Sequence, residues 1–290
     1  MSVKPNKPAK PQIETTGHVW DGIEELNTPM PRWWLWTFIA CIIWGIGYAI
    51  AYPAWPMLSR ATPGLLGAST RADVAEDIKR FELANAEISA RLAAADLTAI
   101  AGDVALQSYA TSAGAAIFRT NCSQCHGSGA AGVQASGYPN LLDDDWLWGG
   151  DITAIHATIA HGIRNDTDPD ARFSQMPAFV DILEKPQIAQ VVQHVLAISD
   201  QDHDAAMAQD GAALFGENCA SCHGDGGLGN REFGAPNLTD AIWLYGKSPE
   251  KLLETITYSR GGVMPSWTQK LTEAEIRAVA SYVHQLGGGE

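Results

Sequence analysis

Two cysteines separated by two residues and followed at once by a histidine occur twice in this sequence. Thiols at this spacing reach the two vinyl groups of one porphyrin, and the adjacent histidine reaches the iron as its proximal ligand. A redox-active dithiol or half of a zinc site would compete. Neither pair, however, has another cysteine to complete a zinc set, and a histidine follows both. The sequence predicts two covalently bound haem c groups, held by Cys122, Cys125 and His126, and by Cys219, Cys222 and His223.

The second axial position of each iron is open to a methionine, a further histidine or nothing. Met176 and Met264 each precede a proline at equivalent places, 50 and 41 residues after their histidines. A thioether ligand favours ferrous iron and raises the reduction potential. Met-Pro is also a loop packing feature, but Met30, Met57 and Met207 do not recur in this way. We predict Met176 and Met264 as the sixth ligands.

The pairing of methionines with haems stays open in the sequence. Chain order suggests that each methionine ligates the haem of its own copy. Two tandem domains packed face to face could exchange these loops, so that Met176 serves the second haem and Met264 the first.

Other candidate residues have weaker support. Trp146 and Trp243 are matched, and they could floor the haem pockets, bind a propionate through the indole N–H, or only pack in the core. The remaining histidines do not recur at equivalent positions, which predicts surface or loop residues; they are His156, His161, His194, His203 and His284. No catalytic residue is predicted.

An internal repeat must position these residues. Segments 114–127 and 211–224 match at 9 of 14 positions, and 137–150 and 234–247 at 8 of 14, both at an offset of 97 residues. Segments 175–179 and 263–267, and 183–198 and 271–286, align at an offset of 88. The nine residues that the second copy lacks fall near 164–172, so the first copy has a longer loop before its methionine.

Each copy, 111–199 and 208–288, reads as helical. A short helix leads into the haem motif. A glycine-rich loop, a middle helix (about 151–163 and 248–259), the methionine loop and an amphipathic closing helix follow. That order resembles the class I cytochrome c fold. The predicted fold is mainly α, with two tandem class I cytochrome c domains behind one N-terminal transmembrane helix.

The predicted transmembrane segment is 33–55. Twenty residues from Trp33 to Tyr52 carry no charge, enough to cross a hydrocarbon core of about 30 Å. Tryptophans and tyrosines cluster at its two ends, as at membrane interfaces. A cleaved signal peptide fits poorly, because the run starts late and is too long. Cys41 lies inside it, so the five cysteines form no disulfide framework.

Two arguments orient the chain. Lys4, Lys7, Lys10 and Arg32 precede the span, which places residues 1–32 in the cytoplasm by the positive-inside rule. Covalent haem attachment takes place outside the bacterial cytoplasm, which places both haem domains in the periplasm. We expect a single-pass protein of the bacterial inner membrane.

The segments that flank the span carry less information. Residues 1–17 are typical of a disordered tail. Residues 18–31 hold apolar residues among acids, and predict at most a weak helix along a membrane or a partner. Residues 56–110 combine a Pro/Gly/Ser linker with an amphipathic helix over 70–98, begun by a capping box of Thr70 and Asp73. This helix is either a spacer or a docking helix for a partner.

The net charge of −14 and pI near 4.9 argue against nucleic acid as a partner. They favour a basic, soluble electron carrier that is steered in electrostatically, although solubility alone explains acidity equally well.

The whole chain resembles the dihaem subunit of cbb3-type cytochrome c oxidases (CcoP or FixP). The least generic part is the segment before the span, with Asp21, Gly22, Ile23, Glu24, Glu25, Asn27, Pro31, Arg32, Trp33 and Trp34. The resemblance implies electrons from a cytochrome c or the bc1 complex. It also implies two partner subunits, a monohaem cytochrome c and a haem b/copper catalytic subunit that reduces oxygen to water.

On this interpretation the chain is not an enzyme by itself, since two six-coordinate haems leave no position for oxygen. Two alternatives remain, the dihaem subunit of a periplasmic dehydrogenase and a haem enzyme or sensor such as a dihaem peroxidase. The peroxidase would need one haem without its methionine.

Overall fold

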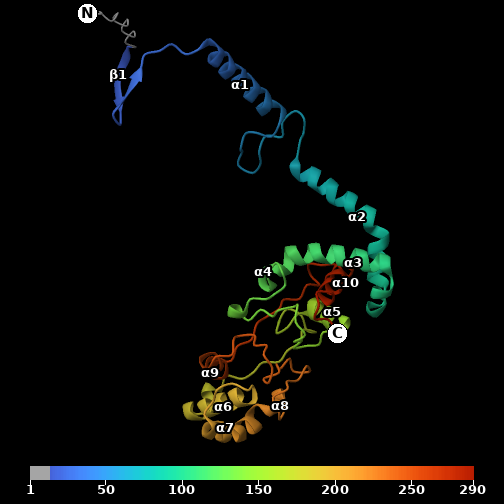
Figure 1. Ribbon diagram of the computed structural model, residues 1–290. Coiled ribbons are helices and arrows are strands. Elements are labelled where there is room, and N and C mark those ends of the chain that lie inside the picture. Colours follow the sequence, from blue (N-terminus) through green and yellow to red (C-terminus); the bar gives the residue numbers. More distant parts are fainter. Residues whose placement is uncertain (1–13) are drawn as a thin grey trace, which may run out of the picture. The chain divides into compact units, whose positions relative to one another are not determined.

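The computed structural model describes residues 14–290, so most of the expected disordered tail, residues 1–17, and the early lysines lie outside the described residues. The chain divides into two compact units, of which the first ends at Glu82 and the second begins at Leu83. Figure 1 shows a mostly helical protein, as expected from the sequence.

The first unit opens with an antiparallel hairpin of β1 (Thr15–Trp20) and β2 (Ile23–Leu26). The expectation of a weak helix over 18–31 is therefore wrong. Asp21 and Gly22 join the strands with φ of 48° and 82°. Asp-Gly is a strong signal for a two-residue hairpin turn, and it lies between β-favouring residues.

Helix α1 (Arg32–Ala51) is 20 residues long, and its side chains, including Cys41, are exposed or half-exposed. Its length and mean hydropathy of 1.8 make it a candidate membrane span. The linker folds back on its end, where the backbone N–H groups of Leu65 and Leu66 donate to the carbonyls of Ile50 and Ala51.

Helix α2 (Thr70–Ala94) confirms the amphipathic helix, although it stops four residues early. The predicted capping box of Thr70 and Asp73 is not formed. Ser69 begins the helix instead, because its Oγ accepts a hydrogen bond from the N–H of Ala72. Only the last turns of α2 are buried: Leu92 has no exposed surface, whereas Val74 is 57% exposed.

The second unit holds the two repeats, each with its haem motif in a four-residue helix. The first repeat contains α3 (Val104–Ile117), α4 (Ser123–His126), α5 (Ile152–His161) and α6 (Lys185–Ile198). The second contains α7 (Ala205–Asn218), α8 (Ala220–His223), α9 (Pro249–Tyr258) and α10 (Glu273–His284). Short helical turns are η1 (Leu97–Gly102), η2 (Phe118–Cys122), η3 (Gln134–Ser136) and η4 (Phe179–Asp181).

Matched caps begin the equivalent helices of the two repeats. The side chains of Asp151 and Ser248 accept from the first turns of α5 and α9. Capping boxes start both closing helices, from Glu184 and Gln187 in α6 and from Thr272 and Glu275 in α10. The two copies thus fold by the same local rules.

The closing helices are exchanged between the repeats. Helix α10 packs on α3, and α6 packs on α7 (Figure 1). Gly114 of α3 lies so close to α10 that a Cβ there would be 2.2 Å from the Ala278 carbonyl oxygen. At the equivalent Gly211 of α7, a Cβ would be 2.0 Å from the Gln190 carbonyl oxygen of α6.

Each hydrophobic core therefore draws on both repeats. We call α3, α4, α5 and α10 the first body, and α6, α7, α8 and α9 the second body. The first core includes Phe118, Ile155 and Val279, and the second includes Phe179, Val191 and Phe215. The boundaries 111–199 and 208–288 delimit the sequence repeats, and the packing units cross them.

Candidate haem-binding sites

The two histidines of the haem motifs have equivalent environments. His126 Nδ1 lies 3.2 Å from the Pro139 carbonyl oxygen, and His223 Nδ1 lies 3.1 Å from that of Pro236. Such a contact requires Nδ1–H, which leaves the lone pair on Nε2, as in histidine metal ligands. Burial lowers the pKa of both imidazoles, so both are neutral at pH 7. Each histidine is therefore fixed in the tautomer that can ligate iron through Nε2.

The first cysteine of each motif packs against a core. Burial, with a smaller effect of the neighbouring thiol, raises the pKa of Cys122 and of Cys219 to about 11. Both thiols are therefore protonated at neutral pH. The second cysteines are more accessible: Cys125 is exposed and Cys222 is half-buried.

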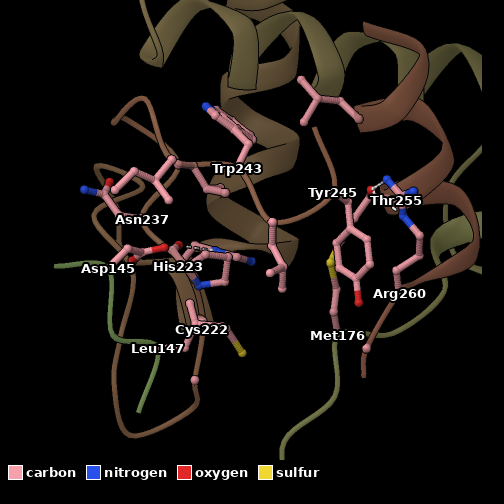
Figure 2. Close-up of a pocket in the computed structure, with 18 of the residues that line it drawn as sticks. Asp145, Leu147, Met176, Cys222, His223, Asn237, Trp243, Tyr245, Thr255 and Arg260 are labelled. Atoms are coloured by element: carbon pink, nitrogen blue, oxygen red, sulfur yellow. Dashed lines mark hydrogen bonds between the residues drawn. The ribbon is translucent and has the colours of Figure 1, made fainter. Parts of the chain in front are cut away.

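The second body contains a cavity of about 440 Å³. In Figure 2, His223 and Cys222 lie on one side of it, and Met176 lies on the opposite side. Trp243 and Tyr245 also line the cavity, and Tyr245 lies beside Met176. Apolar side chains from α6, α7 and α9 complete the lining; they include Val191, Val195, Phe215, Leu252 and Ile256.

This donor set fits haem c. Two thiols, an imidazole nitrogen and a thioether sulfur surround an apolar cavity whose volume lies in the range of cofactor pockets. In the first body, Cys122 and Met264 pack against one core, together with Trp146 and Trp267. The same residue types are thus gathered in both bodies.

The structure brings each methionine to the haem motif of the other repeat. Met176 packs against the core that holds Cys219, and Met264 against the core that holds Cys122. Chain order suggested the opposite pairing. The methionine loops thus pack as the exchange that the sequence left open would require, and they cross between the bodies together with the closing helices.

Backbone contacts hold the exchanged loops in place. Ile163 and Met264 exchange two hydrogen bonds, with N···O distances of 2.9 and 3.0 Å. The Met176 carbonyl oxygen accepts a hydrogen bond from Ser259 Oγ at 2.6 Å. Each methionine loop is thus tied to the segment that follows the middle helix of the other repeat.

The indole N–H groups of the matched tryptophans donate hydrogen bonds to backbone carbonyls. Trp146 donates to the Gly288 carbonyl, and Trp243 donates to that of Asp240 at 3.0 Å. Both rings also pack against the cores. Core packing is therefore seen for both, and Trp243 in addition lines the cavity, as the pocket-floor alternative expects.

The expectation that the unmatched histidines lie on the surface or in loops holds for His203 and only in part for the other four. Only His203 is exposed and outside a helix. Four are half-buried on helices because their rings pair with neighbours, as His156 does with Glu273 and His161 with Asp168. The four are His156, His161, His194 and His284.

Sequence reasoning missed a repeated arginine. Arg172 and Arg260 each stand four residues before a methionine. Arg172 donates to Thr158 Oγ1 at 2.9 Å and lies 5.8 Å from the centre of the Trp148 ring. The alignment at an offset of 88 places the two arginines at one position, which was the signal that could have found them.

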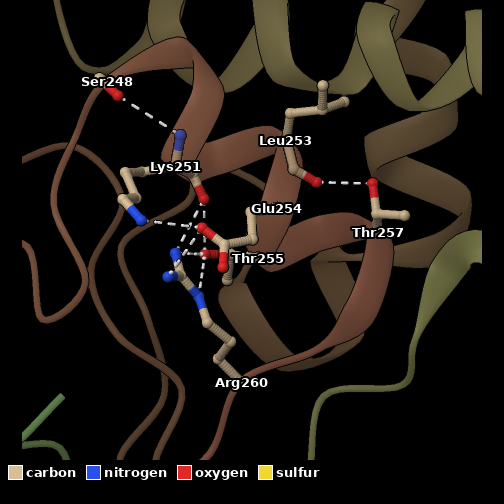
Figure 3. A network of polar contacts seen from close by, with 7 residues as sticks. All are labelled: Ser248, Lys251, Leu253, Glu254, Thr255, Thr257 and Arg260. Atoms are coloured by element: carbon tan, nitrogen blue, oxygen red, sulfur yellow. Dashed lines mark hydrogen bonds and ion pairs between the residues drawn. The ribbon is translucent and has the colours of Figure 1, made fainter. Parts of the chain in front are cut away.

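Arg260 makes the matching contacts in the second body. Its Nε donates to Thr255 Oγ1 at 2.9 Å, and its guanidinium lies 4.5 Å from the centre of the Tyr245 ring. Figure 3 shows that it also contacts Glu254 and the carbonyl of Lys251. Each arginine therefore joins the segment before a methionine to the middle helix of its own repeat.

The two bodies touch through equivalent aromatic–glycine contacts. A Cβ at Gly137 would lie 2.1 Å from the Tyr245 ring, and one at Gly234 would lie 2.2 Å from the Trp148 ring. Gln134 Nε2 also donates to the Trp243 carbonyl at 2.8 Å. The two candidate sites are therefore held side by side, since these contacts leave no room for side chains between them.

Fold and donor sets together define a c-type cytochrome with two tandem domains. Comparison with known families agrees. Residues 12–59 match the N-terminal domain of cytochrome oxidase-cbb3, FixP. Residues 110–195 and 206–283 match cytochrome c oxidase, cbb3-type, subunit III, once in each repeat. The chain belongs to this family of cbb3-type oxidase subunits.

Curated relatives agree over the full length. The chain is 63% identical over 292 residues to a cbb3-type cytochrome c oxidase subunit CcoP from Cereibacter sphaeroides, with both chains covered completely. It is 57% identical over 301 residues to the CcoP subunit from Rhodobacter capsulatus, again with complete coverage of both. It is 49% identical over 278 residues to a subunit FixP from Sinorhizobium medicae, with 96% of each chain covered.

Proposed function

We propose that this chain is the dihaem electron-transfer subunit of a cbb3-type terminal oxidase. The carrying observation is that Met176 lies across an apolar cavity from the second haem motif, and that Met264 and Cys122 pack against one core, in a chain that belongs to the oxidase family. Bound haem iron supplies one-electron exchange between its ferrous and ferric forms. The dehydrogenase alternative has no support from the family match.

The protein's own residues orient the haems and close off their irons. Cys122, Cys125, Cys219 and Cys222 would form the thioether links. His126 with Met264 would ligate one iron, and His223 with Met176 the other. With one histidine and one methionine on each iron, these side chains would leave no ligand position for oxygen. Oxygen reduction would therefore take place in another subunit, and the chain would not be an enzyme by itself.

Helix α1 would anchor the subunit in the bacterial inner membrane. Its 20 residues supply about 30 Å of helix, and none of its side chains is buried in the structure. The positive charges before the span and the covalent haems after it support a cytoplasmic N-terminus and periplasmic haem domains.

The proposed partners follow from the family and the charge. Electrons would come from a basic cytochrome c or the bc1 complex, attracted by the net charge of −14. They would leave to the monohaem cytochrome c and haem b/copper subunits of the oxidase. Nucleic acid is not an expected partner.

The test uses the complex purified through this chain. It should contain a haem b/copper protein and consume oxygen with reduced cytochrome c as donor. Met264→Leu should abolish the methionine–iron charge-transfer band of the haem on Cys122 and Cys125, and Met176→Leu that of the other haem. To assign each band, both cysteines of one motif are replaced by alanine, which leaves a single haem.

Met207→Leu, which changes a methionine of α7 that does not recur, is the matched control and should keep both bands. If Met264→Leu removed the band of the haem on Cys219 and Cys222, the exchanged ligation would be wrong. Copurification with a periplasmic dehydrogenase, without oxygen consumption, would support the alternative function.

A further inference from the structure

We propose that Arg164 is a positioning residue shared by both haem sites, in which one guanidinium holds the two methionine loops at once. This inference rests on the proposed ligation by Met176 and Met264. Arg164 Nε donates to the Gly262 carbonyl at 2.7 Å, and its Nη1 donates to the Ser174 carbonyl at 3.0 Å.

The two accepting carbonyls are equivalent in the repeat. Ser174 and Gly262 are related by the offset of 88, and each stands two residues before its methionine. They lie in the segments where the chain leaves one body and enters the other. Neither segment belongs to a helix or a strand, so these carbonyls need hydrogen-bond donors from elsewhere.

The side chain suits this role. Arg164 is half-buried and lines the cavity of the second body. Burial lowers its pKa, but a guanidinium stays charged at pH 7. Charged donors make stronger hydrogen bonds than neutral ones, and the rigid fork of arginine can address two carbonyls in fixed directions. A lysine can place one ammonium between them but cannot reproduce the fork.

The backbone at Arg164 is held in an uncommon conformation. Its φ is 51°, in the left-handed region that residues other than glycine seldom occupy. The N–H of Arg164 donates to the Arg172 carbonyl at 2.7 Å, which closes the loop of the inserted residues. Strain of this kind persists only where the surroundings fix the conformation. Here the strained backbone directs the Arg164 side chain toward Ser174 and Gly262, in the two segments that precede the methionines.

Arg164 also breaks the symmetry of the repeat. It lies within the nine-residue insertion that the second copy lacks, so the second repeat has no equivalent arginine. The same insertion holds a second contact that serves one loop only. Asp168 accepts from Ser266 Oγ at 2.8 Å, and Ser266 lies two residues after Met264. Asp168 therefore offers a matched control within the same loop.

The test compares Arg164→Ala, Arg164→Lys and Asp168→Ala in the haem-loaded oxidase complex. The readouts are the methionine–iron charge-transfer bands, the reduction potentials of both haems and the fraction of ferrous haem that binds carbon monoxide. Arg164→Ala should raise the carbon monoxide-reactive fraction at both haems, by about tenfold, because each loop loses a charged hydrogen bond. Arg164→Lys should give a smaller rise at both, and Asp168→Ala should affect only the haem on Cys122 and Cys125.

The outcomes separate this inference from the proposed function. Unchanged bands and potentials in Arg164→Ala, or a change at one haem only, would overturn the shared role while leaving ligation intact. If Arg164→Ala fails to retain haem, Arg164→Lys decides: a change at both haems supports the inference, and wild-type behaviour overturns it. Should Met176→Leu and Met264→Leu keep both bands, the proposed ligation itself fails.

Discussion

The two bodies are built from the same parts but hold their methionine loops differently. In the first body, Met264 pairs with the backbone of Ile163, and the side chain of Ser266 is held by Asp168. In the second body, the backbone of Met176 is held by Ser259 Oγ. The nine inserted residues, which include Asp168, account for the extra contact. An insertion that looks like a longer loop in the sequence therefore supplies hydrogen bonds that hold the methionine loops in place.

The comparison also shows why two similar bodies need not be independent. Each closing helix and each methionine belongs to the body formed by the other repeat. A substitution that destabilises one repeat should therefore affect both candidate haem sites. This dependence distinguishes a protein with exchanged closing helices from one with two independently folded cytochrome domains joined by a linker.

A disulfide cross-link tests the exchange of the closing helices, and it has the largest expected effect because the link either forms or does not. Thr111 Oγ1 of α3 donates to Gln285 Oε1, just after α10, at 2.9 Å. With Cys41→Ser, the pair Thr111→Cys and Gln285→Cys should form a disulfide, because these side chains touch. Mobility on non-reducing gels after proteolysis between the repeats measures the link.

The control pairs the same position with the other closing helix. Ala197 of α6 is the repeat equivalent of Gln285. The pair Thr111→Cys and Ala197→Cys should stay unlinked. A disulfide in this pair, and none in the first, would show that each closing helix packs within its own repeat.

Substitution of the helix-packing glycines should have the next largest effect. A Cβ at Gly211 would lie 2.0 Å from the backbone of α6, so Gly211→Ala forces α6 and α7 apart. Such overpacking costs about 1–3 kcal/mol of unfolding free energy. A Cβ at Gly216, in the same helix, would meet no atom within 4 Å. Gly216→Ala should stabilise the protein by about 1 kcal/mol through helix propensity.

Denaturant unfolding of the haem-loaded protein measures both variants. Because the second core contains α6 of the first repeat, Gly211→Ala should lower the denaturant midpoint at both haems. Equal effects of Gly211→Ala and Gly216→Ala would contradict the close packing of α6 on α7.

Local patterns determined what the sequence could predict. The haem motifs, the methionines and the amphipathic helices follow from spacing and periodicity, which act over a few residues. The hairpin at Thr15–Leu26 depends on the Asp-Gly turn, whereas the apolar residues around that turn also suit a weak helix.

The exchange could not be predicted because both pairings satisfy the same patterns. Helices α6 and α10 have similar amphipathic faces, and Gly114 and Gly211 offer the same crossing point to either. Contacts that depend on tertiary structure decide between them, such as Tyr245 on Gly137 and the two hydrogen bonds of Arg164. Arg164 itself had no counterpart in the second repeat, so the alignment could not mark it.

Asp145 provides the smallest test, and it concerns another difference between the repeats. It lines the cavity of the second body (Figure 2), and the second repeat has Ile242 at the equivalent position. Burial, followed by the charges of Asp240, Asp143 and Asp144, raises the pKa of Asp145 to about 6. An unfolded aspartate has a pKa near 3.9, so the native state binds this proton more tightly.

The sign of the pH effect follows from this difference. Between about pH 4 and 6 the native state holds more protons than the unfolded state, so the unfolding free energy falls as the pH rises through this window. Asp145→Asn should remove this slope and stabilise the protein at pH 7 by about 1 kcal/mol, a modest value because the side chain is only half-buried and solvent screens its charge. Denaturant unfolding at pH 5 and 7 measures the slope, with the exposed Asp144→Asn as control. An unchanged slope in Asp145→Asn would show that the carboxyl titrates as an ordinary surface group, and that its burial contributes no pH dependence to the stability.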